Sequence, residues 1–142
     1  SLRDASLEQL QAVGDTLPQT IFRRCRYVIE ENARVLKAAQ NLERGDLEAL
    51  GNLLTQTHKG LQELYEVSCP EVDFLVENAN ALPGVLGARI MGGGFGGCCL
   101  IMVHGDAIAE VRKHLLSAYF GSFDLKAESL EVRLGDGVRL RS

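Results

Sequence analysis

The chain has 142 residues, of which 46% are hydrophobic and 24% charged, a composition typical of one globular domain with a buried core. Its net charge of -4 argues against a nucleic-acid or anionic-membrane surface, because both need a concentrated positive field. No apolar run approaches the roughly 18 residues of a membrane span, and the start, Ser1-Leu2-Arg3-Asp4, is neither an initiator Met nor a signal peptide. We therefore expect a single cytoplasmic domain over residues 1–142, cut from a longer parent chain.

The first two thirds of the chain are predicted to be helical. Apolar residues at three-to-four spacing indicate a long amphipathic helix over 18–41, and a second runs from a cap at Asp46 to Tyr65. Two consecutive amphipathic helices predict a helical hairpin. The stretch Ser68-Cys69-Pro70-Glu71 has the form of a capping box, with Pro in the first turn, and predicts a third helix to about residue 82.

After residue 84 the pattern changes to short apolar runs. Val85–Met91 and Cys98–Val103 predict two strands separated by a tight glycine loop. Asp106 can cap a fourth helix.

The end of the chain predicts more sheet. Alternation at Leu130, Val132 and Leu134 indicates a further strand, and Gly135-Asp136-Gly137 turns the chain toward a possible last strand, Val138–Leu140. The expected fold is α+β: a helical hairpin and a third helix, then a small, mostly antiparallel sheet with helices on one face.

The four cysteines are predicted to be reduced and structural. They form no CxxC pair and have no His at zinc-ligand spacing, so the sequence predicts no metal site. If the adjacent pair Cys98-Cys99 lies in a strand, its side chains point to opposite faces.

The glycine run is the strongest functional feature. Five of the fifteen glycines lie within residues 92–97, between two predicted strands. A P-loop or dinucleotide fingerprint instead needs a helix N-terminus after its glycines. The remaining interpretations are a backbone nest that binds an anion, a tight loop that braces another phosphate loop, and a strained hairpin with no ligand.

Four stretches together resemble the galactokinase form of the GHMP small-molecule kinases. The segment from Gly87 to Cys98, with its GGGFGGC core, looks like the third motif of that family. The agreeing stretches, in chain order, are Arg24-Cys25-Arg26-Tyr27-Val28 with Glu31-Asn32, then His58, then Tyr65-Glu66-Val67-Ser68-Cys69-Pro70-Glu71. They span roughly residues 20 to 104.

The resemblance implies a ferredoxin-like C-terminal domain of an ATP-dependent sugar kinase. Such enzymes phosphorylate the C1 hydroxyl of galactose with Mg2+ on the phosphates, and their catalytic Asp, sugar pocket and main phosphate loop lie in the N-terminal domain. The partner of this chain would be that domain, and nucleotide and sugar would bind mainly there. The implied nucleotide-site residues are Gly92, Gly93, Gly94, Phe95, Gly96 and Gly97. No catalytic or metal-binding residue is assigned, and the isolated chain is expected to be inactive.

The sequence departs from the family at two places. Ala88-Arg89-Ile90-Met91 stands where galactokinases commonly have Ser-Arg-Met-Thr, so the hydroxyl next to the loop is absent. Glu63 and Leu64 stand where the family usually has two Asp residues. Two alternatives therefore stay open, a non-catalytic galactokinase-like ligand sensor and a GHMP kinase for another sugar or small alcohol.

Three single residues have competing interpretations. His58 is either a satisfied core histidine or a contact of the cleft. Arg89 either reaches a phosphate or an acidic group across the domain interface, or is solvated. Phe95 is expected to plug the core or an interface and so to keep the loop from flexing.

Overall fold

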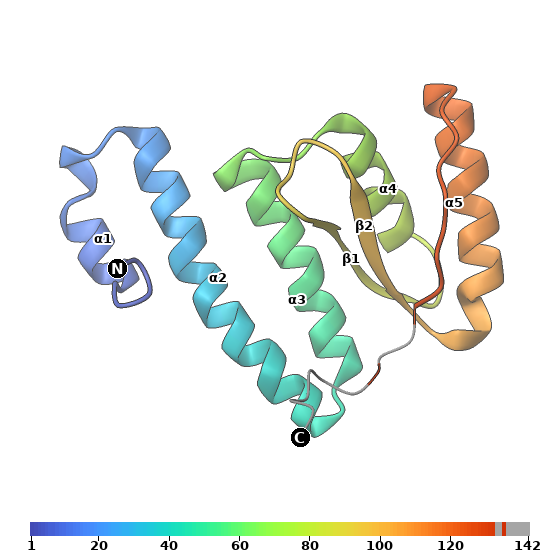
Figure 1. Ribbon diagram of the computed structural model, residues 1–142. Helices are drawn as coiled ribbons and strands as arrows, with labels where there is room; N and C mark the ends of the chain where they lie inside the picture. Colours follow the sequence, from blue (N-terminus) through green and yellow to red (C-terminus); the bar gives the residue numbers. More distant parts are fainter. Residues whose placement is uncertain (133–134, 136–142) are drawn as a thin grey trace, which may run out of the picture.

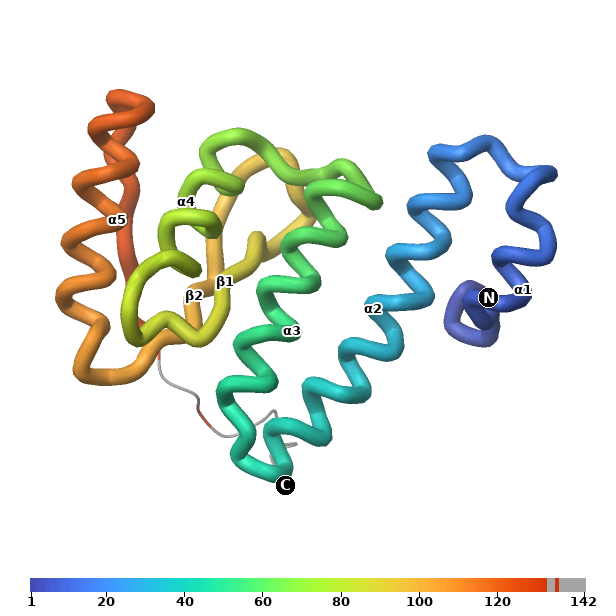
Figure 2. Tube along the Cα trace, turned by 180° about the vertical axis from the view of Figure 1, so that it is seen from behind, coloured from blue at the N-terminus to red at the C-terminus, as the bar shows by residue number. Residues whose placement is uncertain are grey.

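The structure is a computed structural model that describes residues 1–132 and residue 135. Its main elements, in chain order, are α1 (Leu7–Ala12), α2 (Gln19–Arg44), α3 (Leu47–Gly60), α4 (Pro70–Asn80), β1 (Val85–Met91), β2 (Cys98–Val103) and α5 (Ile108–Phe123). Three short helical turns join them: the 3-10 turns η1 (Gly14–Thr16) and η3 (Gly105–Ala107), and the π-helical turn η2 (Leu61–Tyr65). Figures 1 and 2 show α1, α2 and α3 side by side, followed by the strands with α4, and α5 at the far end.

The predicted helical hairpin is confirmed, because α2 packs against α3. The chain turns between them at Gly45, whose φ of +69° is in the left-handed region that ends many helices. Asp46 then caps α3, since its carboxylate accepts a 3.0 Å hydrogen bond from the Ala49 N–H. The apolar stripe of α2 is covered only in part, because Tyr27 is buried but Leu36 is 68% exposed.

Two helix starts differ from the prediction. The helix α1 was not predicted, although Ser6 and Gln9 form a capping box before its single buried residue, Leu10. The predicted box at Ser68 is wrong, because the N-cap of α4 is Cys69 and has no side-chain cap. Pro70 at the first helical position places the cap at Cys69, which leaves Ser68 outside the helix.

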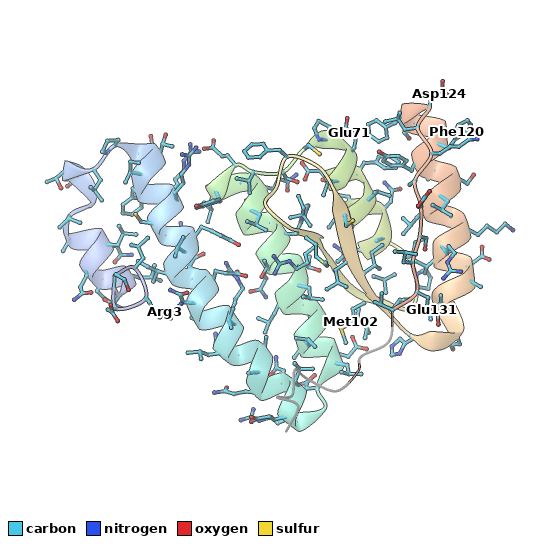
Figure 3. The ribbon with its side chains drawn as sticks, viewed as in Figure 1. Arg3, Glu71, Met102, Phe120, Asp124 and Glu131 are labelled. Atoms are coloured by element: carbon cyan, nitrogen blue, oxygen red, sulfur yellow. The ribbon has the colours of Figure 1, made fainter. Side chains whose placement is uncertain are left out.

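The strands β1 and β2 form the predicted antiparallel hairpin, with Met91 opposite Cys98 beside the glycine loop. One face of the hairpin packs on α4 and α5. Side chains fill the space between these elements (Figure 3). The buried residues of this core are Val72, Val76, Ala79, Ala88, Ile90, Val111 and Leu115. The α+β fold is therefore confirmed, with a two-stranded sheet in the described part of the chain.

The other side of β1 packs on α3 so closely that the two backbones are in contact. A Cβ atom added to Gly51 of α3 would lie 2.2 Å from the Leu86 carbonyl oxygen, and one added to Gly87 would lie 1.9 Å from the Gly51 carbonyl oxygen. Only residues without a Cβ allow this approach. The two glycines therefore set the position of α3 along β1.

The region around α5 corrects two predictions. Asp106 does not cap α5, because it lies inside η3 and Ala107 is the N-cap. Leu130 and Val132 are in no strand, and Leu130 is 87% exposed. Leu134 and the predicted strand Val138–Leu140 lie outside the described residues. An ion pair of 3.5 Å joins Arg112 of α5 to Glu131 in the segment after it, which Figure 3 shows beside that helix.

Candidate functional site

The candidate site is the glycine loop, residues 92–97, at the tip of the β1–β2 hairpin. It is seated on the segment between η2 and α4. The Phe95 N–H donates a 2.7 Å hydrogen bond to the Val67 carbonyl oxygen. Directly beside this bond Gly94 has a φ of +93°, and a Cβ atom on it would lie 2.4 Å from the same oxygen. Both backbone conformation and space thus require glycine at position 94.

The opposite side of the loop is open. No atom lies within 4 Å of a Cβ atom built on Gly92, Gly93 or Gly96. The Phe95 side chain is 77% exposed, so the prediction that it plugs the core of this domain is wrong. Its backbone holds the loop to Val67, while its ring extends into solvent. An interface with another domain stays a prediction for this ring.

The segment under the loop is itself fixed to α2. After η2 the chain reverses at Glu66, which has a φ of +62°. The Glu66 carboxylate lies 3.1 Å from Nη2 of Arg23 and 3.7 Å from Nη2 of Arg24. The rings of Tyr27 and Tyr65 also meet, with centroids 5.3 Å apart. Two of the stretches that carried the family resemblance therefore contact each other and position Val67.

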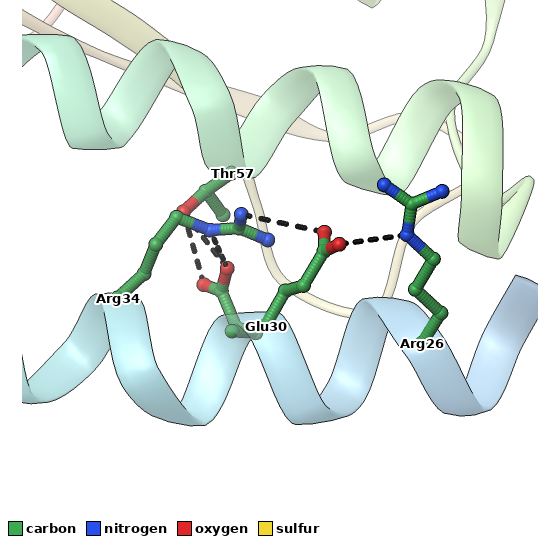
Figure 4. A network of polar contacts seen from close by, with 5 residues as sticks. Arg26, Glu30, Arg34 and Thr57 are labelled. Carbon is green, nitrogen blue, oxygen red and sulfur yellow. Dashed lines mark hydrogen bonds and ion pairs between the residues drawn. The ribbon is translucent and has the colours of Figure 1, made fainter. Parts of the chain in front are cut away.

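A second polar network joins α2, α3 and β1 around Glu31. Thr57 donates its hydroxyl to the Glu31 carboxylate at 3.0 Å, and Arg34 Nε lies 2.7 Å from the same carboxylate. Figure 4 shows Thr57 of α3 above this row of α2 side chains. Arg89 Nη1 of β1 is 3.9 Å from Glu31. An acidic partner of Arg89 thus lies within this domain, and the Arg89 side chain is only partly exposed.

His58 of α3 is a buried core histidine, 4% exposed. Its Nδ1 accepts a 3.3 Å hydrogen bond from the Ile90 N–H of β1. Its Nε2 lies 3.2 Å from Oδ1 of Asp73 on α4, but the pair does not meet hydrogen-bond geometry. Burial lowers the pKa of His58 more than the adjacent Asp73 raises it. The ring is therefore neutral at neutral pH, and the interpretation of His58 as a core histidine is confirmed.

The two cysteines after the loop lie as the strand alternation predicts. Cys98 is exposed, and Cys99 packs against the core. Burial raises the pKa of the Cys99 thiol to about 11. All four cysteines are free thiols.

The backbone of the loop is partly engaged within the domain and partly open. One of its N–H groups, that of Phe95, already bonds to Val67, so it is not free for an anion. The remaining backbone is open, which suits close approach by another backbone or a phosphate. Among the described residues, no group of three His, Cys, Asp or Glu side chains could hold a metal ion. A cavity of about 210 Å³ lies elsewhere, between α1 and α2.

Comparison with known protein families shows which family the chain belongs to. The family model described as "GHMP kinases C terminal" matches residues 38–121, which is more than half of the chain. The chain belongs to the GHMP kinase C-terminal family. The match begins within α2 and ends within α5, so it includes the β1–β2 hairpin, the glycine loop and the segment on which the loop rests.

Individual relatives of this GHMP kinase domain are galactokinases. It is 45% identical to galactokinase from Homo sapiens over 122 residues, covering 86% of this chain and 31% of the relative. It is 40% identical to galactokinase from Thermotoga neapolitana over 139 residues, covering 98% of this chain and 39% of the relative. The crystal structure of Lactococcus lactis galactokinase complexed with galactose matches with a TM-score of 0.84 and 35% identity, covering 89% of this chain and 33% of that one.

This GHMP kinase domain thus spans between 31% and 39% of the length of these relatives. Among the described residues, no helix is both long enough and apolar enough to cross a membrane.

Several residues of the site were not singled out from the sequence. Val67 supports the loop through its backbone oxygen, and no side-chain pattern marks such a role. Asp73 lies inside the predicted third helix and carried no signal of its contact with His58. Thr57 directly precedes His58 but was not part of the predicted apolar stripe, and nothing in the sequence marked its hydroxyl as buried.

Proposed function

We propose that this chain is the C-terminal domain of a galactokinase-like sugar kinase, and that residues 92–97 brace the phosphate-binding loop of the parent's N-terminal domain. In this proposal the parent is cytoplasmic and transfers the γ-phosphoryl group of ATP to the C1 hydroxyl of galactose. ATP and Mg2+ are held mainly by the N-terminal domain, where Mg2+ neutralises the phosphate charge. The glycine loop borders that nucleotide site.

The observation that supports this role is the two-sided character of the glycine loop. One side is fixed to its own domain by Gly94 and the Phe95 N–H. The other side exposes backbone and the Phe95 ring. Phosphoryl transfer depends mostly on positioning and electrostatic stabilisation, so a brace of this kind affects turnover without contacting the sugar.

The test compares two substitutions in the full-length parent. A side chain at Gly94 would overlap the Val67 carbonyl oxygen at 2.4 Å, whereas one at Gly93 would meet no atom within 4 Å. We expect Gly94→Val to lower kcat by about tenfold or more, since small misplacements near the reacting groups cost up to about 100-fold. We expect Gly93→Ala to retain kcat within about twofold. ADP release in the presence of galactose measures turnover, and melting temperatures show whether each variant folds.

Equal kcat values for the two folded variants would contradict the proposed brace. The isolated chain provides a second check. Incubated with ATP, Mg2+ and galactose, it is expected to release no ADP, and steady ADP formation would overturn the assignment of the active site to the missing domain.

Two alternative functions share the same loop. Met91, which stands in place of the family Thr, is 47% exposed beside the loop and offers no hydroxyl. This favours a galactokinase-like sensor that binds nucleotide and sugar without turnover. Saturable binding of both ligands by the full-length parent, with no ADP formed, would identify a sensor. Faster turnover with another sugar or small alcohol would identify a kinase of different specificity.

A further inference from the structure

A chain of polar contacts, buried at His58 and partly buried at Asp73 and Ser68, connects the two places that hold the glycine loop. The first is β1, the strand that leads into the loop. The second is the segment around Val67, on which the loop rests. His58, Asp73 and Ser68 lie between these two places, and we call these three residues the His58 relay.

The first contact of the His58 relay is with β1. Ile90 stands opposite Cys99 in the hairpin, but its N–H points away from β2 and donates to Nδ1 of His58 at 3.3 Å. An acceptor at Nδ1 requires that this nitrogen carry no proton. The neutral ring therefore has its proton on Nε2, which faces Asp73.

The second contact continues to the segment under the loop. Oδ1 of Asp73 lies 3.2 Å from His58 Nε2 and also accepts a hydrogen bond from the Ser68 hydroxyl. Ser68 directly follows Val67, whose carbonyl oxygen binds the Phe95 N–H. One carboxylate thus contacts both the histidine that holds β1 and the residue next to the support of the loop.

We propose that the His58 relay positions the glycine loop, and that protonation of His58 releases β1 from it. A proton on Nδ1 would place two donors, Nδ1–H and the Ile90 N–H, against each other inside the core. A buried N–H without an acceptor is costly, so β1 would have to shift. His58 is a positioning residue in this scheme, because it acts through β1 and does not touch a substrate.

The groups around His58 set the direction of its titration. Asp73 and Glu77 of α4 raise its pKa, Arg89 of β1 lowers it, and burial lowers it most. The net shift is downward, so the folded protein favours the neutral ring. The stability that this provides is present above the ordinary His pKa of about 6.5 and is lost as the pH falls through the lower folded value.

Two substitutions of His58 distinguish the role of its Nδ1 from that of its Nε2. Asn carries an oxygen near the position of Nδ1 and can still accept from Ile90, but it cannot reach Asp73 and does not titrate. Gln reaches the position of Nε2 and can donate to Asp73, but it leaves the Ile90 N–H without an acceptor. Lys59→Gln is the matched control, since the neighbouring Lys59 side chain is 70% exposed on the same helix.

The experiment uses the full-length parent and measures two quantities. Hydrogen exchange of peptides that cover residues 88–96 reports on β1 and the loop. The pH profile of kcat with ATP, Mg2+ and galactose reports on function, and this second readout rests on the proposed function. We expect His58→Gln to speed exchange by about fivefold, the effect of one lost hydrogen bond, and to lower kcat by about tenfold. We expect His58→Asn to keep the wild-type exchange of β1, because Asn still accepts from the Ile90 N–H. We also expect it to lose the acidic limb of the kcat profile, which in wild type lies below the ordinary His pKa of about 6.5 because the pKa of the folded ring is lowered.

Unchanged exchange in His58→Gln, or a retained acidic limb in His58→Asn, would overturn the relay. Faster exchange with wild-type kcat would support the relay and refute the proposed role of the loop, so the two failures are distinguishable. If His58→Gln does not fold, Ser68→Ala replaces it. That variant removes one hydroxyl of the relay and is expected to speed exchange of the Phe95 peptide, whereas an unchanged rate would overturn the proposal.

Discussion

The contact between α3 and β1 predicts that Gly51→Ala destabilises the fold, although Ala is the better helix former. In an open helix the substitution would stabilise by about 1 kcal/mol. Here the new Cβ atom would lie 2.2 Å from the Leu86 carbonyl oxygen and 2.4 Å from its carbonyl carbon. Ordinary van der Waals contact begins at 3.4 Å, so the available space is short by about 1.2 Å.

The obstacle is backbone on both sides, so no side-chain rotation relieves it. The helix α3 must move away from β1, and a separation of about 1 Å forfeits up to half of the dispersion energy of the atoms in contact. Such overpacking costs up to about 3 kcal/mol. After the gain in helix propensity, we expect a net loss of about 2 kcal/mol, or roughly 8 °C in melting temperature for a domain of this size.

Urea unfolding of the 142-residue chain, followed by far-UV circular dichroism, measures the effect. Gly121→Ala is the control, because Gly121 lies within α5 and a Cβ atom there meets nothing within 4 Å. We expect this control to stabilise by up to about 1 kcal/mol. If Gly51→Ala were as stable as Gly121→Ala, the close approach of α3 to β1 would be refuted.

Two further predictions concern side-chain chemistry. Iodoacetamide should modify the exposed Cys98 much faster than Cys99, whose pKa burial raises to about 11, and peptide mass spectrometry that found equal rates would contradict the strand alternation. Burial, followed by the nearby Glu31 charge, raises the pKa of Tyr27 to about 12. The free energy of unfolding should therefore fall as the pH rises from about 10, where an unfolded tyrosine ionises, to about 12, and Tyr27→Phe should reduce that slope in alkaline urea titrations.

The order of elements through α5 could largely be predicted from the sequence, since apolar periodicity and turn residues determine it locally. The helix starts were less predictable, because the sequence pattern of a capping box occurs both where the serine caps a helix and where it does not. Ser6 forms a capping box, whereas Ser68 in a similar pattern bonds to Asp73. The predicted strand at Leu130 and Val132 was wrong because two exposed alternating residues carry no information about a partner strand.

At the candidate site the sequence located the loop but not what holds it. The glycine run identifies residues 92–97, and the resemblance placed them in a family that the comparison confirms. Gly93 and Gly94 are the same residue type, but only Gly94 lies against the Val67 carbonyl oxygen and so has no room for a side chain. The partner of His58 likewise depends on how α3, α4 and β1 meet. Such long-range contacts between backbone and side chains leave no local pattern.

The π-helical turn η2 accommodates one extra residue at the end of α3. A π turn contains one residue more than the α-helical turn it replaces, yet both complete about one turn of the helix, so the chain leaves in the same direction. Deleting one residue within Leu61–Tyr65 would therefore let the helix close as a regular α-helical turn and leave Glu66 beside Arg23 and Arg24, with Val67 still under Gly94. Homologous domains that keep the same support for the loop should therefore differ in length here by at most one residue.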